Sequence, residues 1–210
     1  MAVALLDSHI TAVETDPNGV MTISSASDRL ALLPFLAENN GQVTHSQMEI
    51  GGVSDISSTN AKAYYEVGTA DQHAYGYWWD ESAIASFADN DIDANDGISL
   101  SKQAWTFLTF SGVDQTAPVV SQTGTDASTD SLAISTTSTV DDYDVVIVCR
   151  QSGNRDITAY GPLTTQALQT NNLFTAFVAY GQGGGGTITI TGNGVAADMT
   201  YSHLIIKAAS

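Results

Sequence analysis

Two stretches of the sequence carry apolar side chains on both faces of an extended chain, and they constrain the fold more than any other feature. They are residues 104–110 (AWTFLTF) and residues 173–180 (LFTAFVAY). Successive side chains of a β-strand point to opposite faces, so strands of this kind require cover on both sides. These two segments are therefore predicted to be central strands of the core.

Shorter segments rich in β-branched and aromatic residues recur along the rest of the chain, between clusters of Gly, Asn, Asp and Ser. The clearest is residues 187–191 (TITIT), in which Ile and Thr alternate between the two faces. Few segments sustain the spacing of an amphipathic helix, so we expect an all-β fold, an antiparallel β-sandwich with little or no helix. Further strands are expected at residues 20–24, 29–37, 43–50, 63–67, 73–79, 132–135, 144–150, 157–160 and 201–207.

Three local features refine this prediction. Pro34 cannot donate a ladder hydrogen bond and is expected at an edge strand or a bulge. The glycines of residues 181–186 are typical of a hairpin loop, and the polar residues 121–130 of a linker between strands. In the segment after residue 110, Gly112 permits a bend, Asp114 can form an Asx turn and Pro118 stops further pairing.

The length of 210 residues is compatible with a single large β domain. We expect an N-terminal arm at residues 1–18 and one β-sandwich domain at residues 19–210. No internal repeat is evident from the sequence. Cys149 is the only cysteine, which excludes an internal disulfide and is typical of a small core residue.

The charge balance excludes several classes of partner. The chain has 23 acidic and six basic residues and a formal net charge of −17, so a nucleic-acid backbone would be repelled. No segment approaches the roughly 20 apolar residues of a membrane-spanning helix. The first residues, MAVALLDS, have no basic residue before their apolar run and are not typical of a secretory signal.

Searches for catalytic and metal-binding motifs predict no enzyme, no cofactor and no metal site. The acidic segment 89–97 (DNDIDANDG) lacks the spacing of an EF-hand and is expected to be a solvated turn, with a calcium site of another kind as the alternative. The four histidines lack metal-ligand spacing, and no serine lies in a nucleophile elbow. Carboxylate pairs for glycoside hydrolysis could be drawn from Asp80, Glu81, Asp141, Asp142 and Asp144, but so acidic a chain always offers such pairs.

The aromatic run Tyr75, Tyr77, Trp78 and Trp79 is the strongest candidate contact site. Trp78 and Trp79 must point to opposite faces of a strand, so on a one-sided sheet at most one of them is in the core. The other is expected to lie in a subunit contact or to form a platform that stacks on a surface glycan.

Three phrases of the sequence resemble a diffuse family of β-sandwich structural proteins of tailed bacteriophages. They are SDRLALL at residues 27–33, WTFLTFSGVDQTAP at residues 105–118 and DVVIV at residues 144–148. In that family an R-x-L strand, a strand ending in F-x-G-V-D-Q and a D-x-x-V-V strand follow one another in this order. The resemblance implies a jelly-roll-like sandwich, and its motifs mark strand ends and turns.

Members of this family serve as capsid decoration (cement) proteins, fibres or receptor-binding modules. The resemblance therefore implies a virion structural protein on the capsid surface, assembled in the host cytoplasm, that contacts the major capsid protein. It also implies a homo-oligomer, specifically a trimer. The alternative is a carbohydrate-binding or receptor-binding module of a head or tail fibre, which would bind surface glycans through the aromatic run.

Overall fold

The computed structural model describes residues 1–10, 18–39, 48–56, 62–67, 70–93, 103–150, 156–170 and 174–210. Within these ranges the chain forms seventeen β-strands and one helix of four residues. The predicted all-β, antiparallel architecture is confirmed. No helix in the same ranges is long and apolar enough to cross a membrane.

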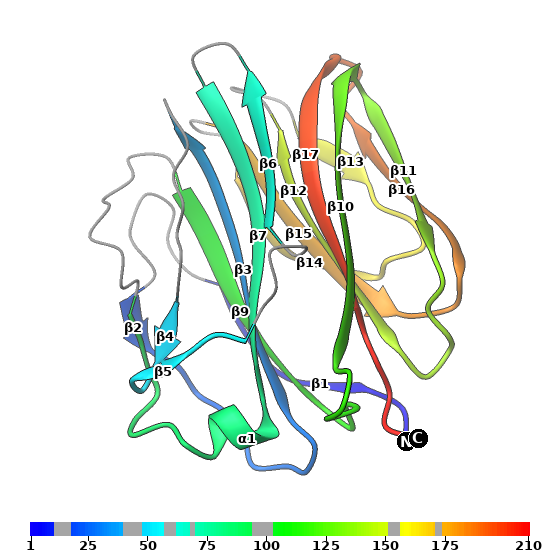
Figure 1. Cartoon of the computed structure of the whole chain (residues 1–210). Coiled ribbons are helices and arrows are strands. Elements are labelled where there is room, and N and C mark those ends of the chain that lie inside the picture. Colours follow the sequence, from blue (N-terminus) through cyan, green and yellow to red (C-terminus); the bar gives the residue numbers. More distant parts are fainter. Residues whose placement is uncertain are drawn as a thin grey trace.

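The first half of the chain builds two sheets, which we call the N-inner and N-outer sheets (Figure 1). The N-inner sheet has the strand order β1-β9-β3-β7-β6, and the N-outer sheet the order β2-β8-β4-β5. Helix α1 (Glu81–Ile84) follows β7 and begins at Asp80, whose carboxylate accepts a hydrogen bond from the Ala83 backbone N–H. The strands are β1 (Ala4–Ile10), β2 (Asn18–Val20), β3 (Leu30–Asn39), β4 (Glu49–Ile50), β5 (Val53–Ser54), β6 (Lys62–Val67), β7 (Ala70–Asp80), β8 (Asp91–Asp93) and β9 (Gln103–Ser111).

The second half builds the C-inner and C-outer sheets. Their strand orders are β10-β17-β12-β15-β14 and β11-β16-β13. The strands are β10 (Val119–Thr129), β11 (Ser131–Thr136), β12 (Tyr143–Arg150), β13 (Ile157–Ala159), β14 (Thr165–Thr170), β15 (Thr175–Gln182), β16 (Gly186–Gly192) and β17 (Ala197–Ile206).

The two halves have the same topology, so the structure contains the internal repeat that the sequence did not reveal. Strands β1, β2, β3, β4, β6, β7, β8 and β9 correspond in order to β10 through β17, and this equivalence maps the N-inner order onto the C-inner order. It also maps β2-β8-β4 onto β11-β16-β13. In each repeat the first strand pairs with the last and the second with the last but one, which is the connectivity of a jelly roll. The jelly-roll-like architecture is confirmed and occurs twice.

The packing of one repeat on the other follows the same equivalence. Strand β7 packs against β17 and β12, and its counterpart β15 packs against β9 and β3. In the same way the contacts of β6 with β17 and β10 are matched by contacts of β14 with β9 and β1. Strand β3 contacts β12, its own counterpart. Exchange of the repeats therefore maps the interface onto itself, and the two jelly rolls are related by an approximate twofold axis.

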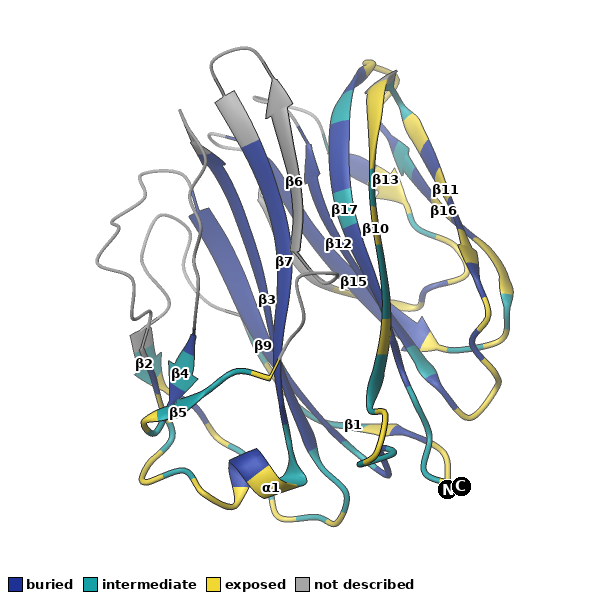
Figure 2. Ribbon diagram, viewed as in Figure 1, coloured by how far each residue is buried: buried dark blue, intermediate teal, exposed yellow. Residues whose placement is uncertain are grey.

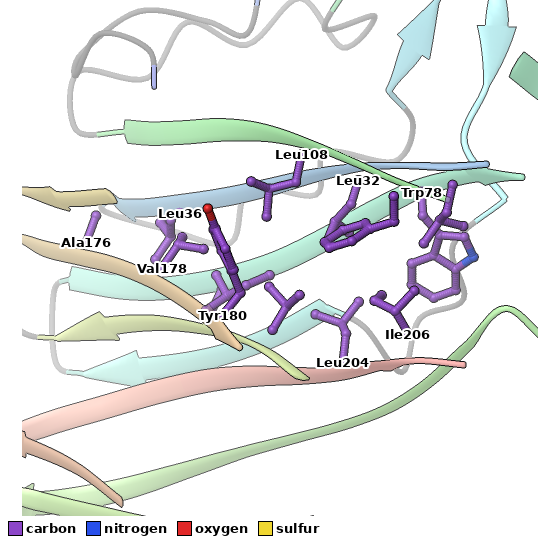
Figure 3. Packing of buried hydrophobic residues seen from close by; sticks show 14 of the residues in the cluster. Leu32, Leu36, Trp78, Leu108, Ala176, Val178, Tyr180, Leu204 and Ile206 are labelled. Carbon is purple, nitrogen blue, oxygen red and sulfur yellow. The ribbon is translucent and has the colours of Figure 1, made fainter. Parts of the chain in front are cut away.

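The four sheets stack in the order N-outer, N-inner, C-inner, C-outer, with a hydrophobic core in each of the three gaps (Figures 1 and 2). We call the core between the inner sheets the shared core. It joins side chains of both repeats, among them Leu32, Leu36, Trp78 and Leu108 on one side and Ala176, Val178, Tyr180, Leu204 and Ile206 on the other (Figure 3). Because each inner sheet is covered on both faces, β9 and β15 are buried along almost their whole length. The prediction that they are central strands is confirmed.

The prediction for Pro34 is wrong, because β3 lies in the middle of its sheet between β9 and β7. Pro34 is opposite Gly76 on β7. On the β9 side, pairing stops after Leu32–Leu108 and resumes at Phe35–Trp105 without a change of register. The missing N–H is thus accommodated by a gap in one hydrogen-bond ladder rather than by a sheet edge or a bulge.

Two predicted loops are also corrected. Residues 121–130 lie within or next to β10, an edge strand on which Thr123, Thr125 and Asp126 are exposed, so that the segment resembles a linker in the sequence. The glycines of residues 181–186 do not close a hairpin, because β15 belongs to the C-inner sheet and β16 to the C-outer sheet. Gly183 lies so close to the Thr139 carbonyl oxygen that a Cβ atom would collide with it, and Gly185 has a φ of +71°.

The predicted N-terminal arm is, over Ala4–Ile10, strand β1 of the N-inner sheet, paired with β9. The N-terminal ammonium of Met1 donates a 2.8 Å hydrogen bond to the Ala209 carbonyl oxygen, and the Val3 N–H donates to the Asp141 carbonyl oxygen. Residues 11–17 of the arm lie outside the described residues, as do residues 43–47 of the strand predicted at 43–50.

The shared core predicts that the two repeats unfold together. Leu204 belongs to the C-terminal repeat, whereas all three tryptophans, at positions 78, 79 and 105, lie in the N-terminal repeat. Leu204→Ala removes buried volume from the shared core and is expected to lower the free energy of unfolding by about 2–5 kcal/mol. Urea titration followed by tryptophan fluorescence should report this loss, although the substitution is in the other repeat.

Val120→Ala is the matched control, because Val120 is 49% exposed. It should shift the midpoint little. The repeats would be independent if Leu204→Ala left the urea midpoint of the fluorescence transition unchanged while circular dichroism showed β-structure lost at a lower urea concentration.

Candidate functional site

The predicted aromatic contact site is buried. Tyr75, Tyr77, Trp78 and Trp79 lie on β7, and Trp78, the most exposed of the four, retains 6% of its surface. The indole N–H of Trp79 donates to the Val53 carbonyl oxygen at 2.9 Å. A stacking platform needs an exposed ring face, so these four residues form no glycan platform in this structure.

The expectation that only one of the two tryptophans is in the core assumed a sheet covered on one face. The N-inner sheet is covered on both. Trp78 points into the shared core, and Trp79 points into the core beneath the N-outer sheet. The two tryptophans do point to opposite faces of β7, as the sequence predicts. The sequence of β7 alone does not indicate how many sheets cover it.

The remaining sequence candidates serve the fold where the structure describes them. Asp91 and Asp93 of the acidic segment lie on β8, and residues 94–97 lie outside the described residues. Among the residues that the structure describes, no group of three or more His, Cys, Asp or Glu side chains is placed to hold a metal ion. Cys149 is fully buried, and its thiol donates to the Ala37 carbonyl oxygen at 3.4 Å.

The bend at Gly112 and the Asx turn at Asp114, both predicted after β9, are present. Pro118 does not stop pairing, because β10 begins at the next residue and the Pro118 carbonyl oxygen accepts from the Lys207 N–H. The Asp114 carboxylate accepts hydrogen bonds from the Thr116 and Ala117 N–H groups at 2.8 and 3.3 Å, as an Asx turn requires. Gln115 accepts from the Glu81 N–H and donates to the Arg29 carbonyl oxygen. It thereby ties the start of α1 to the start of β3.

A polar site that the motif search missed lies in the C-terminal repeat, where β10 and β17 of the C-inner sheet face β11 of the C-outer sheet. A cavity of about 130 Å³ opens there. Its lining includes Val120, Gln122, Ser135, Thr137, His203 and Ile205. His203 retains 1% of its surface and Ser135 is exposed, so the cavity leads from solvent to a buried imidazole.

A buried carboxylate lies behind this imidazole. Asp144, at the start of β12, accepts a 2.7 Å hydrogen bond from His203 Nε2. It also accepts from the hydroxyls of Thr136 and Ser138 at 2.9 and 2.7 Å. Burial by itself raises the pKa of the Asp144 carboxyl, but the three hydrogen bonds together outweigh it, so the pKa lies below its ordinary value. The carboxylate is therefore ionised and fully engaged.

Ser138 extends the network to the glycine loop. Its hydroxyl accepts from the backbone N–H groups of Gly184 and Gly185 at 3.2 and 3.4 Å while it donates to Asp144. The crossing from β15 to β16 is thus fixed to the same carboxylate as the imidazole. This explains why the loop packs against the molecule instead of closing a free hairpin.

The opposite ring nitrogen of His203 contacts Gln122. Nδ1 lies 3.1 Å from the Gln122 amide nitrogen, which also donates to the Ser135 carbonyl oxygen at 2.9 Å. An amide nitrogen can only donate, so Nδ1 accepts and the proton of the neutral ring is on Nε2, toward Asp144. In this arrangement the imidazole has no spare lone pair with which to take a proton from a nucleophile. The site can hold neighbouring strands together and can contact a small polar molecule in the cavity.

Sequence reasoning did not find this site because Gln122, Asp144 and His203 come from three different strands. The available signal was the polar residue in each apolar strand, namely Asp144 before VVIV and His203 before LII. Of the other histidines, His73 is buried with its Nδ1 2.8 Å from the Tyr75 hydroxyl, His9 lies on β1, and His45 lies outside the described residues.

Replacement of the buried carboxylate tests the network. Asp144→Asn keeps the shape of the side chain but removes the charge and presents an amide N–H group to a neighbouring donor. It is expected to lower the free energy of unfolding at pH 7 by about 1.5–3 kcal/mol, measured by urea denaturation. The same substitution at exposed Asp141 is the control and should have little effect.

The pH dependence follows from the lowered pKa of Asp144 in the folded state. Its contribution is fully present above the ordinary Asp value of about 3.9 and is lost as the pH falls through the folded value. The difference in stability between wild type and Asp144→Asn should therefore shrink in acid. A difference that stays constant down to about pH 2 would contradict this assignment.

Comparison with known proteins adds no relative: no family model, no curated protein and no solved structure matches this chain.

Proposed function

We propose that the protein is a structural component of a tailed-bacteriophage particle, a decoration (cement) protein that contacts neighbouring major capsid subunits on the outer surface. The observation that carries the proposal is the pair of jelly rolls joined by an apolar shared core. Jelly rolls recur in viral capsid proteins as well as in lectins and cupins. The step from fold to role is an analogy, and the phage-like phrases in the sequence supply its direction.

The arrangement of the chemical groups supports a role without catalysis. The aromatic run is used in two cores, and the buried carboxylates Asp142 and Asp144 are each engaged by several donors of the same chain. A rigid, closely packed body of this kind suits a protein that clamps its neighbours, because it can transmit load without deforming. Trimer formation and residence on the virion belong to the same proposal.

The alternative, a carbohydrate-binding or receptor-binding module of a fibre, would require a surface other than residues 75–79. Burial removes the feature on which that alternative depended. We therefore keep the capsid-surface role as the proposal.

Quantitative mass spectrometry of purified particles tests it. A decoration protein should be present in many copies, in a fixed ratio to the major capsid protein. Stripped particles should rebind the purified protein and gain thermal stability with its concentration, since ligand binding to the assembled state stabilises that state. A few copies per particle would indicate a fibre or tail-tip role, and absence from particles would refute the proposal.

A further inference from the structure

The approximate twofold symmetry allows polar contacts on corresponding strands of the two repeats to be compared. On the last strand of the N-terminal repeat, Thr109 pairs with Asp7 on β1 and with Ala31 on β3. On the last strand of the C-terminal repeat, His203 pairs with Gln122 on β10 and with Val146 on β12. Thr109 and His203 therefore lie on corresponding strands of the two repeats, and so do Asp7 and Gln122.

In both repeats a polar side chain on the first strand links the inner sheet to the second strand or to the segment after it, and we call this link a tie. In the N-terminal repeat the Asp7 carboxylate accepts from the Thr109 hydroxyl at 2.7 Å and from the N–H and hydroxyl of Ser24, each at 2.8 Å. It thereby joins the N-inner sheet to the segment after β2. In the C-terminal repeat Gln122 contacts His203 and donates to Ser135 on β11, the counterpart of β2. The chemistry differs: the first tie depends on a carboxylate, the second on an amide beside an imidazole.

The second tie is compatible with only one protonation state of His203. The same amide nitrogen of Gln122 donates to His203 Nδ1 and to the Ser135 carbonyl oxygen. A doubly protonated ring would present an N–H at Nδ1, which that nitrogen cannot accept. Rotation of the amide would offer Oε1 to the ring, but it would also place this oxygen against the Ser135 carbonyl oxygen. Gln122 can serve the protonated ring or Ser135, but not both.

We propose that the Gln122–His203–Ser135 tie is a pH-sensitive latch, which holds β11 to β10 while His203 is neutral and releases it when His203 gains a proton. Release frees Ser135 and widens the cavity between β10 and β11. The tie of the N-terminal repeat contains no imidazole and stays closed over the same range. Acid therefore loosens one jelly roll of the pair and leaves the other intact.

Charged groups face the imidazole from the neighbouring strands. Asp144 on β12 accepts a 2.7 Å hydrogen bond from Nε2. On β10 the ionisable side chain is Asp126, whose negative charge acts on Tyr201, two residues before His203 on β17. Strands β11 and β16, which cover this face, carry no ionisable residue in SLAIST and GTITITG. The positive charge on these strands is that of Arg150 at the end of β12, which is paired with Asp130.

Hydrogen exchange on the whole protein tests the latch. Backbone amides of residues 133–137 should lose protection by roughly tenfold between about pH 7.5 and about pH 5, after correction for the intrinsic rate, because a proton on His203 Nδ1 is incompatible with the Gln122–Ser135 hydrogen bond. The Ser24 amide, which donates to the Asp7 carboxylate, is the internal control and should keep its protection. Equal protection of residues 133–137 at the two pH values would overturn the proposal, as would an equal loss at the Ser24 amide.

Substitutions assign the effect to the tie. His203→Gln should abolish the pH response of residues 133–137, and His9→Gln, at a histidine outside the tie, should preserve it. Gln122→Met removes the link at every pH, so those residues should exchange fast at both pH values. Because Gln122 is only half-buried, this variant carries the test if His203→Gln does not fold. A pH response that persists in Gln122→Met would refute the latch.

Discussion

The apolar contact between the two inner sheets is the constraint on which the rest of the structure depends. A jelly roll normally packs one sheet on its partner and leaves the outer faces to solvent. Here each inner sheet has a second apolar face, and that face is covered by the other repeat. Neither repeat could expose its half of the shared core to water without a large loss of hydrophobic stabilisation, so the two form one body.

The same constraint explains what could be predicted from the sequence. The doubly apolar segments at 104–110 and 173–180 required cover on both sides, and β9 and β15 have it. The sequence could not show that the cover on one side is a second jelly roll. Corresponding strands differ in sequence: β3 is LALLPFLAEN and β12 is YDVVIVCR, while β9 is QAWTFLTFS and β17 is ADMTYSHLII. Topology and inward-facing pattern are preserved, and side-chain identity is not.

The wrong predictions also arise because the surroundings of a strand cannot be obtained from its own sequence. The prediction of an edge strand or a bulge at Pro34 requires every residue of a central strand to use both hydrogen-bond ladders, whereas β3 tolerates a gap on one side. The polar residues of β10 were interpreted as a linker because an edge strand that faces solvent needs few apolar side chains. The Asp144 network was missed because hydrogen-bond partners from β10, β11, β12 and β17 become neighbours only in the folded chain.

Ion pairs engage the basic side chains of this acidic chain, and this determines what its surface offers to a partner. Each basic side chain that the structure describes is paired with an acid: Arg29 with Glu81, Lys207 with Asp142, and fully buried Arg150 with Asp130. Gly192 leaves room for the last pair, since a Cβ atom there would collide with both members. These positive charges hold strand ends and loops together and are engaged by acidic side chains of the same chain. The acidic residues in excess remain to set the field around the protein, and that field favours neutral or basic partner surfaces over polyanions.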